Sequence, residues 1–235
     1  MVPAKNASEM TLRELARYID QSVLKPEFTV ADIKKYSQEG IDFGCKTICV
    51  NPSSLDVVAP MVKGTDTGLC VVCDFPFGLS TTESKVHQAE SYVSRYDIED
   101  LDIVANYGWL RSGEHEKVIE DLKPVVAVCH AHGTKVKVII ETDSLTLAQV
   151  AEGTECAVAA GADFIKSSTG FFTGAEQHGA TVEVVRTMMA AADGRIAVKG
   201  SGCIRTREHF LELIDMGIDR MGIGYRSTPT VLGLK

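Results

Sequence analysis

Two lysines in this sequence end largely apolar segments, and a turn rich in serine and glycine follows each of them. Lys166 follows the run 162–165, and Lys199 follows the run 196–198. Lysine is seldom fully buried unless a partner or a reaction uses it. In apolar surroundings a lysine amine can form an imine with a carbonyl compound, and a second cation nearby favours the uncharged amine. The pair therefore indicates Schiff-base chemistry, although either side chain alone could simply extend to solvent.

The segments that must position these lysines alternate regularly along the chain. Short segments rich in β-branched residues alternate eight times with longer amphipathic segments, which is typical of buried parallel strands joined by helices. Eight such units predict an α/β protein, a single (β/α)8 TIM barrel over residues 1–235. An extra N-terminal helix over residues 12–19 is expected to cover the barrel floor. The expected strands are 20–24, 45–50, 69–75, 100–106, 135–141, 162–167, 195–199 and 219–223.

The helices expected between these strands carry start and stop signals. Several should begin after a capping threonine and end in a glycine. The expected helices include 30–40, 84–96, 114–132, 145–160, 182–192 and 205–216. The caps are Thr29, Thr81, Thr181 and Thr206, and the terminal glycines are Gly40, Gly64, Gly133, Gly161, Gly194 and Gly217.

Charged and amide side chains stand in, or at the ends of, several predicted strands. Catalytic groups of a (β/α)8 barrel gather at the C-terminal ends of the strands, whereas branched apolar side chains normally fill the interior. Because side chains alternate along a strand, Asp102 shares a face with Asn106, and Lys137 shares a face with Glu141. A carboxylate among lysines would offset their charge and transfer protons, so these positions indicate a catalytic site.

The composition excludes several classes of protein. The 235 residues carry a net charge of −8 without a basic run, which argues against a nucleic-acid partner. No apolar stretch of about 18 residues exists, and the polar N-terminus lacks the apolar core of a signal peptide, so neither a membrane partner nor secretion is expected. With this acidic balance, local dipoles and glycine turns are expected to hold any anionic substrate.

The seven cysteines predict a reducing environment. They are odd in number and mostly lie in apolar segments, as reduced core thiols of a cytoplasmic protein do. Cys70 and Cys73 match the spacing of a redox motif, but residues three apart on a strand point to opposite faces. No redox role is therefore expected for this pair.

From residue 19 to about residue 224 the sequence resembles the deoxyribose-phosphate aldolase family, whose members use a lysine Schiff base. The most specific similarity surrounds the two lysines, in 160–171 and in 198–206. Other matching segments are 19–26, 48–52, 75–78, 102–106 and 137–142.

The resemblance implies that Lys166 forms the Schiff base and that Lys199 and Asp102 move protons through an ordered water. The implied reaction is the reversible cleavage of 2-deoxy-D-ribose 5-phosphate into acetaldehyde and D-glyceraldehyde 3-phosphate. It needs neither a metal nor a cofactor, because the protonated imine is the electron sink. The implied partner is a small sugar phosphate, and barrels of this kind often form homodimers. The implied substrate-binding residues are Asp20, Ser22, Asn51, Asn106, Lys137, Ser168, Gly170, Gly202, Gly224, Arg226 and Ser227.

The sequence departs from the family pattern mainly where a phosphate would bind. Cys203 replaces the second of two glycines after the seventh strand, and Tyr225 stands in a turn that usually carries serine. Gln21 replaces a histidine, and the loop 172–179 is longer than usual. These changes predict a weaker or reshaped phosphate site, and they keep open the same chemistry on a different or unphosphorylated aldehyde acceptor.

Two further alternatives have less support in the sequence. A metal-dependent aldolase needs about three ligands and an open position, but His130 and His132 form the only close histidine pair, at a predicted helix end on the barrel floor. A non-catalytic or regulatory barrel has no use for Asp102, Lys166 and Lys199 together, and unused buried charges are costly.

Overall fold

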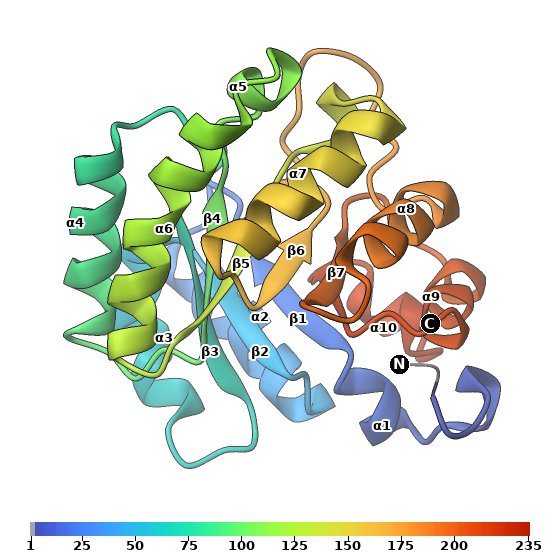
Figure 1. The fold of residues 1–235 in the computed structure, drawn as a ribbon. Helices are drawn as coiled ribbons and strands as arrows, with labels where there is room; N and C mark the ends of the chain where they lie inside the picture. Colours follow the sequence, from blue (N-terminus) through green and yellow to red (C-terminus); the bar gives the residue numbers. More distant parts are fainter. Residues whose placement is uncertain (1–2) are drawn as a thin grey trace.

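The computed structural model describes residues 3–235, and its strands close into one parallel barrel (Figure 1). Each strand pairs with its neighbours in sequence, and β1 pairs with β8 to complete the circle. This confirms the predicted (β/α)8 fold. The strands are β1 (Ile19–Val23), β2 (Thr47–Val50), β3 (Gly68–Cys73), β4 (Asp100–Val104), β5 (Lys135–Ile139), β6 (Phe164–Lys166), β7 (Ala197–Ser201) and β8 (Arg220–Gly224).

Helices form an outer layer around the barrel (Figure 1). Their buried faces, such as Val185 with Met188 and Phe210 with Leu213, complete a core between helices and strands. The longer helices are α2 (Val30–Phe43), α3 (Leu55–Val62), α4 (Thr82–Val93), α6 (His115–Ala131), α7 (Leu147–Ala160), α8 (Val182–Ala192) and α9 (Arg207–Asp215). The short ones are η1 (Ala7–Glu9), α1 (Leu12–Ala16), η2 (Pro52–Ser54), α5 (Tyr107–Arg111), η3 (Thr142–Ser144) and α10 (Thr228–Val231).

The capping signals in the sequence are largely confirmed. All four predicted threonines cap a helix through their hydroxyls, and Gly161 ends α7 in the left-handed region with φ 83°. Gly40 does not end α2, which continues to Phe43 before Gly44. Close packing explains why a glycine stands at position 40, because a Cβ there would lie 2.5 Å from Ile48 Cδ1. The other predicted glycines lie two residues beyond the last residue of their helices, with positive φ: Gly64, Gly133, Gly194 and Gly217.

The predicted extra helix, α1, lies at the N-terminal end of the barrel. Arg17, at its C-terminus, donates hydrogen bonds to the carbonyl oxygens of Cys45 and Asp66, which precede β2 and β3. The helix ends earlier than expected, at Ala16, because the chain joins β1 from Ile19. α1 therefore covers the floor and leaves the opposite end of the barrel open.

The two faces of β3 separate Cys70 from Cys73, as side-chain alternation predicted. Cys70 Sγ lies inside the barrel, 3.4 Å from Cys49 Sγ, whereas Cys73 Sγ faces α4 and lies 3.7 Å from the Lys85 carbonyl oxygen. The two thiols therefore cannot act as a redox pair. Between residues 3 and 235, no helix has both the length and the apolar character needed to cross a membrane.

Candidate active site

Four charged side chains from β4, β5, β6 and β7 meet inside the barrel. The register places Lys166 beside Lys199, and Asp102 beside Lys137. Asp102 Oδ2 accepts hydrogen bonds from Lys166 Nζ at 2.8 Å and from Lys199 Nζ at 2.7 Å, and its Oδ1 lies 3.1 Å from Lys137 Nζ. All four residues are buried. The structure thus brings the three predicted catalytic residues into direct contact.

A second group of charges lies deeper in the barrel and fixes two of these lysines. Lys199 Nζ lies 2.6 Å from Asp20 Oδ2, and Lys137 Nζ lies 2.6 Å from Asp100 Oδ2. Arg220 donates to Asp20 at 2.7 Å and also contacts Asp100 at 3.3 Å. Lys137 and Lys199 are each held between carboxylates, whereas the described ion pairs give Lys166 one partner, Asp102.

These contacts fix the charge states of Asp102 and Lys199. Burial opposes ionisation of Asp102, but the cations of Lys137, Lys166 and Lys199 outweigh it and hold its pKa well below the ordinary value. Burial also opposes the charged form of Lys199, but the carboxylates of Asp102 and Asp20 outweigh it and raise the pKa of Lys199. At neutral pH the site therefore holds a carboxylate and an ammonium group beside Lys166.

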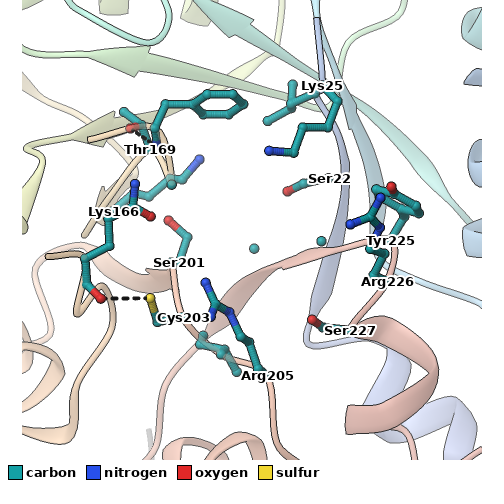
Figure 2. A pocket seen from close by; sticks show the side chains of 18 residues that line it. Ser22, Lys25, Lys166, Thr169, Ser201, Cys203, Arg205, Tyr225, Arg226 and Ser227 are labelled. Carbon is teal, nitrogen blue, oxygen red and sulfur yellow. Dashed lines mark hydrogen bonds between the residues drawn. The ribbon is translucent and has the colours of Figure 1, made fainter. Parts of the chain in front are cut away.

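A cavity of about 420 Å³ opens at the C-terminal ends of the strands and reaches down to Lys166 (Figure 2). Of the four charged residues that meet in the barrel, only Lys166 lines this cavity. The remaining lining residues come from β1, β7 and β8, from the turns after β1, β6, β7 and β8, and from the loop before α8. They are Ser22, Leu24, Lys25, Thr169, Gly170, Phe171, Gln177, Ser201, Gly202, Cys203, Ile204, Arg205, Gly222, Gly224, Tyr225, Arg226 and Ser227.

The cavity wall is basic although the chain as a whole is acidic. Lys25, Arg205 and Arg226 extend into the cavity (Figure 2), and no aspartate or glutamate lines it. Among residues 3–235, no carboxylate forms an ion pair with any of these three cations. Unpaired cations around a cleft raise the local concentration of anions and attract an anionic ligand.

The structure divides the predicted substrate-binding residues into three groups. Asp20 and Lys137 lie in the ion network below the cavity, completely buried, and not on its wall. Their charges are engaged by Asp100, Asp102, Lys199 and Arg220. The predicted residues that do line the cavity are Ser22, Gly170, Gly202, Gly224, Arg226 and Ser227.

Three other predicted residues do not line the cavity and hydrogen-bond to neighbouring residues of the chain. Asn51 Nδ2 donates to the Leu24 carbonyl oxygen at 3.1 Å. Alternation predicted that Asn106 shares a strand face with Asp102, but Asn106 lies beyond the end of β4, and its side chain accepts from Trp109 N and caps α5. Ser168 is buried against Thr142, with 2.8 Å between their hydroxyl oxygens.

Glu141 departs from the predicted alternation. It follows β5 in the left-handed region, with φ 53°, and its carboxylate accepts hydrogen bonds from the backbone N–H and the hydroxyl of Thr169. Burial raises the pKa of Glu141. The side chain therefore braces the turn after β6, which carries Thr169 and Phe171 on the cavity wall.

The sequence predictions omitted several residues that line the cavity, notably Lys25, Arg205, Thr169 and Gln177. Lys25 and Arg205 stand just beyond strand ends, where alternation no longer indicates direction. The positive charge of these two residues, close to predicted strand ends, was the signal in the sequence that could have identified them as cavity residues. Gln177 lies in the long loop 172–179 before α8, whose polar groups were expected near the site without any one of them being assigned a role.

Neither set of potential metal ligands favours a metal. Cys49, Cys70 and Asp102 lie close together, but lysine ammonium groups bind both Asp102 oxygens. Burial, with the hydrogen bond that Cys70 donates to Cys49 and the charge of Asp102, raises the pKa of Cys70, and metal binding needs a thiolate. The histidines His130 and His132 pair with different acids on the barrel floor.

The chain matches known proteins over most of its length. The model for DeoC/LacD family aldolases matches residues 15–227. A deoxyribose-phosphate aldolase of Thermococcus kodakarensis is 43% identical over 215 residues, covering 91% of this chain and 94% of that protein. Among solved structures, an aldolase named QR15 is 34% identical with a TM-score of 0.84, covering 94% of this chain and 95% of that one. A deoxyribose phosphate aldolase from Aeropyrum pernix, described as having a unique tetrameric structure, is 26% identical with a TM-score of 0.84, covering 95% and 91%.

Proposed function

This chain belongs to the DeoC/LacD family of aldolases, and on that premise we propose that it cleaves 2-deoxy-D-ribose 5-phosphate reversibly into acetaldehyde and D-glyceraldehyde 3-phosphate. The position of Lys166 is the observation that carries the proposal. Its amine contacts Asp102 inside the barrel, and the residue lines the cavity where an aldehyde would enter. The enzyme is accordingly an aldehyde-lyase that acts through a lysine Schiff base.

The charge balance of the barrel interior supports Lys166 as the nucleophile. Three carboxylates face four basic groups, and Lys166 has the fewest carboxylate partners among these basic groups. Lys137 and Lys199 are each held between two or more carboxylates, and arginine does not lose its proton in proteins. The carboxylates are Asp20, Asp100 and Asp102, and the basic groups are Lys137, Lys166, Lys199 and Arg220.

The reaction follows from an amine placed in this way. The Lys166 amine adds to the C1 aldehyde of the open-chain sugar and, after loss of water, gives a protonated imine. Loss of the C3 hydroxyl proton breaks the C2–C3 bond, and the electron pair moves into the imine to give an enamine. Glyceraldehyde 3-phosphate leaves, the enamine is protonated at C2, and water then releases acetaldehyde from the lysine.

Asp102 and Lys199 have the protonation states that the proton transfers need. Asp102 is held as a carboxylate and can accept a proton, whereas Lys199 is held as an ammonium group and can donate one. Lys199 Nζ donates a hydrogen bond to Asp102 Oδ2 at 2.7 Å, so a proton can pass between the two groups. In the proposed cycle they exchange protons with the substrate through a water in the cavity.

The basic cavity supports a phosphorylated substrate. The sequence predicts that glycine turns and dipoles hold an anion, and the cavity adds three cations, Lys25, Arg205 and Arg226. This favours the sugar phosphate over the alternative of an unphosphorylated acceptor, because cations bind phosphate strongly. The test is turnover of 2-deoxyribose 5-phosphate beside 2-deoxyribose. Formation of acetaldehyde from neither sugar would contradict the proposed function.

We also propose a cellular location and an oligomeric state for this protein. Six of the seven free cysteines are buried thiols, which supports the proposed cytoplasmic location. The proposed homodimer can be tested by light scattering, and the relative described as tetrameric makes a larger assembly a second outcome of that measurement.

A further inference from the structure

Tyr225, in the turn after β8, belongs to a cluster of three aromatic rings. Its ring centroid lies 3.9 Å from that of Tyr36 and 5.1 Å from that of Phe28, and those two rings lie 5.2 Å apart. Tyr36 is on α2, and Phe28 lies just before this helix. Aromatic contacts of this kind contribute about 0.5–1.5 kcal/mol each beyond the burial of area. The cluster therefore ties the β8 turn to α2 and fixes the Tyr225 ring.

Arg226, the next residue, uses this fixed ring as a support. Its guanidinium carbon lies 5.3 Å from the Tyr225 ring centroid, within the range of a cation–π contact. The side chain is exposed and extends into the cavity (Figure 2), where the described residues provide no carboxylate partner. The guanidinium is thus held in place by a ring and leaves its hydrogen-bond donors free.

Lys25, another of the cavity cations, is supported in the same way. Its Nζ lies 5.1 Å from the Phe171 ring centroid, and the Phe171 ring in turn packs against Phe75 at 5.3 Å. Two cations of the cavity wall are therefore positioned by aromatic rings, not by acidic partners. A carboxylate would neutralise these cations, whereas a ring restrains them and keeps their charge available to a ligand.

We propose that Tyr225 is a positioning residue that holds Arg226 for binding the substrate phosphate, so that this pair sets the preference for phosphorylated sugars. The inference rests on the proposed function for the identity of the substrate. The planar guanidinium matches a phosphate through two parallel hydrogen bonds. A long arginine side chain loses much rotamer freedom when it binds, and a side chain already restrained on a ring loses less.

The test compares variants that remove the ring, the charge or both. Tyr225→Leu removes the ring and keeps apolar volume, Tyr225→Phe keeps the ring, and Arg226→Gln removes the charge. The double variant Tyr225→Leu/Arg226→Gln shows whether Tyr225 acts through Arg226. Arg186→Gln, on the exposed outer side of α8, controls for a general loss of positive charge. For each protein, calorimetry gives the affinity for inorganic phosphate, and kinetics give the kcat/KM ratio of 2-deoxyribose 5-phosphate to 2-deoxyribose.

Tyr225→Leu should weaken phosphate binding and lower the kcat/KM ratio about tenfold, the scale of the rotamer freedom that an unrestrained arginine loses on binding. The change should appear in KM for the phosphorylated sugar and not in kcat. Tyr225→Phe and Arg186→Gln should keep the wild-type ratio, and the double variant should match Arg226→Gln alone. Additive losses in the double variant, an equal loss in Tyr225→Phe, or unchanged phosphate affinity in Tyr225→Leu would overturn the proposal.

Failure of the proposed function has a different signature. A wild-type protein that cleaves neither sugar, but binds inorganic phosphate in a manner dependent on Tyr225, would remove the aldolase assignment and leave this inference standing. Cleavage of the sugar phosphate together with a phosphate affinity that does not depend on Tyr225 would overturn this inference and leave the aldolase assignment standing.

Discussion

The Lys166 amine and the Asp102 carboxylate lie 2.8 Å apart, although 64 residues separate them in the chain. The contact exists because β4 and β6 both flank β5, and the register sets their side chains at nearby depths in the barrel. Asp102 also holds Lys199, so one carboxylate organises two lysines. This shared carboxylate is the basis of the first predictions.

Lys166 should form the covalent intermediate. Incubation with acetaldehyde and borohydride should reduce the imine and add the mass of the donor to the peptide that contains Lys166, because this lysine lines the cavity. Peptide mass spectrometry detects the label, and Lys166→Ala is the control that should remain unlabelled. A label on Lys199 or Lys137 in the wild-type protein would refute the assignment.

Lys199→Leu and Asp102→Asn should each lower turnover by about 10²-fold or more, the usual scale for lost acid–base assistance. Both residues contact each other beside Lys166, so either change disrupts the proton path. Steady-state kinetics measure the effect, and circular dichroism shows whether the barrel remains folded. Near-normal turnover in a folded variant would exclude that residue from the mechanism.

The ion network should stabilise the protein across a wide pH range. The pKa of Asp102 is lowered on folding, so its contribution is full above its unfolded pKa of about 3.9 and is lost as pH falls through the lower folded value. The pKa of Lys199 is raised, so its contribution is full below its unfolded pKa of about 10.4 and is lost as pH rises through the higher folded value. Urea unfolding gives the free energy of unfolding of the wild type and of Asp102→Asn at each pH. The difference between the two proteins should therefore change little between pH 5 and pH 9. A difference between the two proteins that disappears near pH 6 would contradict the assigned direction for Asp102.

The preference for a phosphorylated acceptor should be modest and should fall further in Arg226→Ala. Cys203, Tyr225 and Arg226 line the cavity. The family resemblance implies that Cys203 and Tyr225 replace residues of the phosphate-binding turns, and we expect Arg226 to supply part of the lost binding. Each lost hydrogen bond to a charged group costs about 1.5–3 kcal/mol. Relative kcat/KM values for phosphorylated and unphosphorylated acceptors measure the preference. A preference above about 10⁴-fold that survives Arg226→Ala would mean that backbone amides alone bind the phosphate.

Gly40→Ala should destabilise the protein by about 1–3 kcal/mol, the usual cost of overpacking a core. The new Cβ would lie 2.5 Å from Ile48 Cδ1 and 2.9 Å from Gln21 Nε2, so either these buried side chains or α2 would have to shift. Chemical denaturation measures the free energy of unfolding. Lys34→Ala, on the exposed face of the same helix, is the control and should change stability by less than about 0.5 kcal/mol. Equal stability of the two variants would show that the contact relaxes freely.

The sequence by itself determined the barrel and the main reactive groups. Apolar strands and capped helices alternate through local patterns, and local patterns are visible in a single chain. Lys166 and Lys199 stand at strand ends, and the C-terminal ends of all strands in a barrel meet at one face. Their proximity therefore followed from the fold class without any knowledge of side-chain contacts.

The tertiary structure alone decided how deep each side chain lies and which partner it has. Alternation predicts the face of a strand, but depth in the barrel depends on the register between strands, which the sequence does not state. For this reason Asp20 and Lys137 lie in the ion network below the cavity. Beyond the strand ends alternation stops, so Asn106 turns to cap α5, and Lys25, Arg205 and Arg226 converge on the cavity only through the folded positions of separate turns.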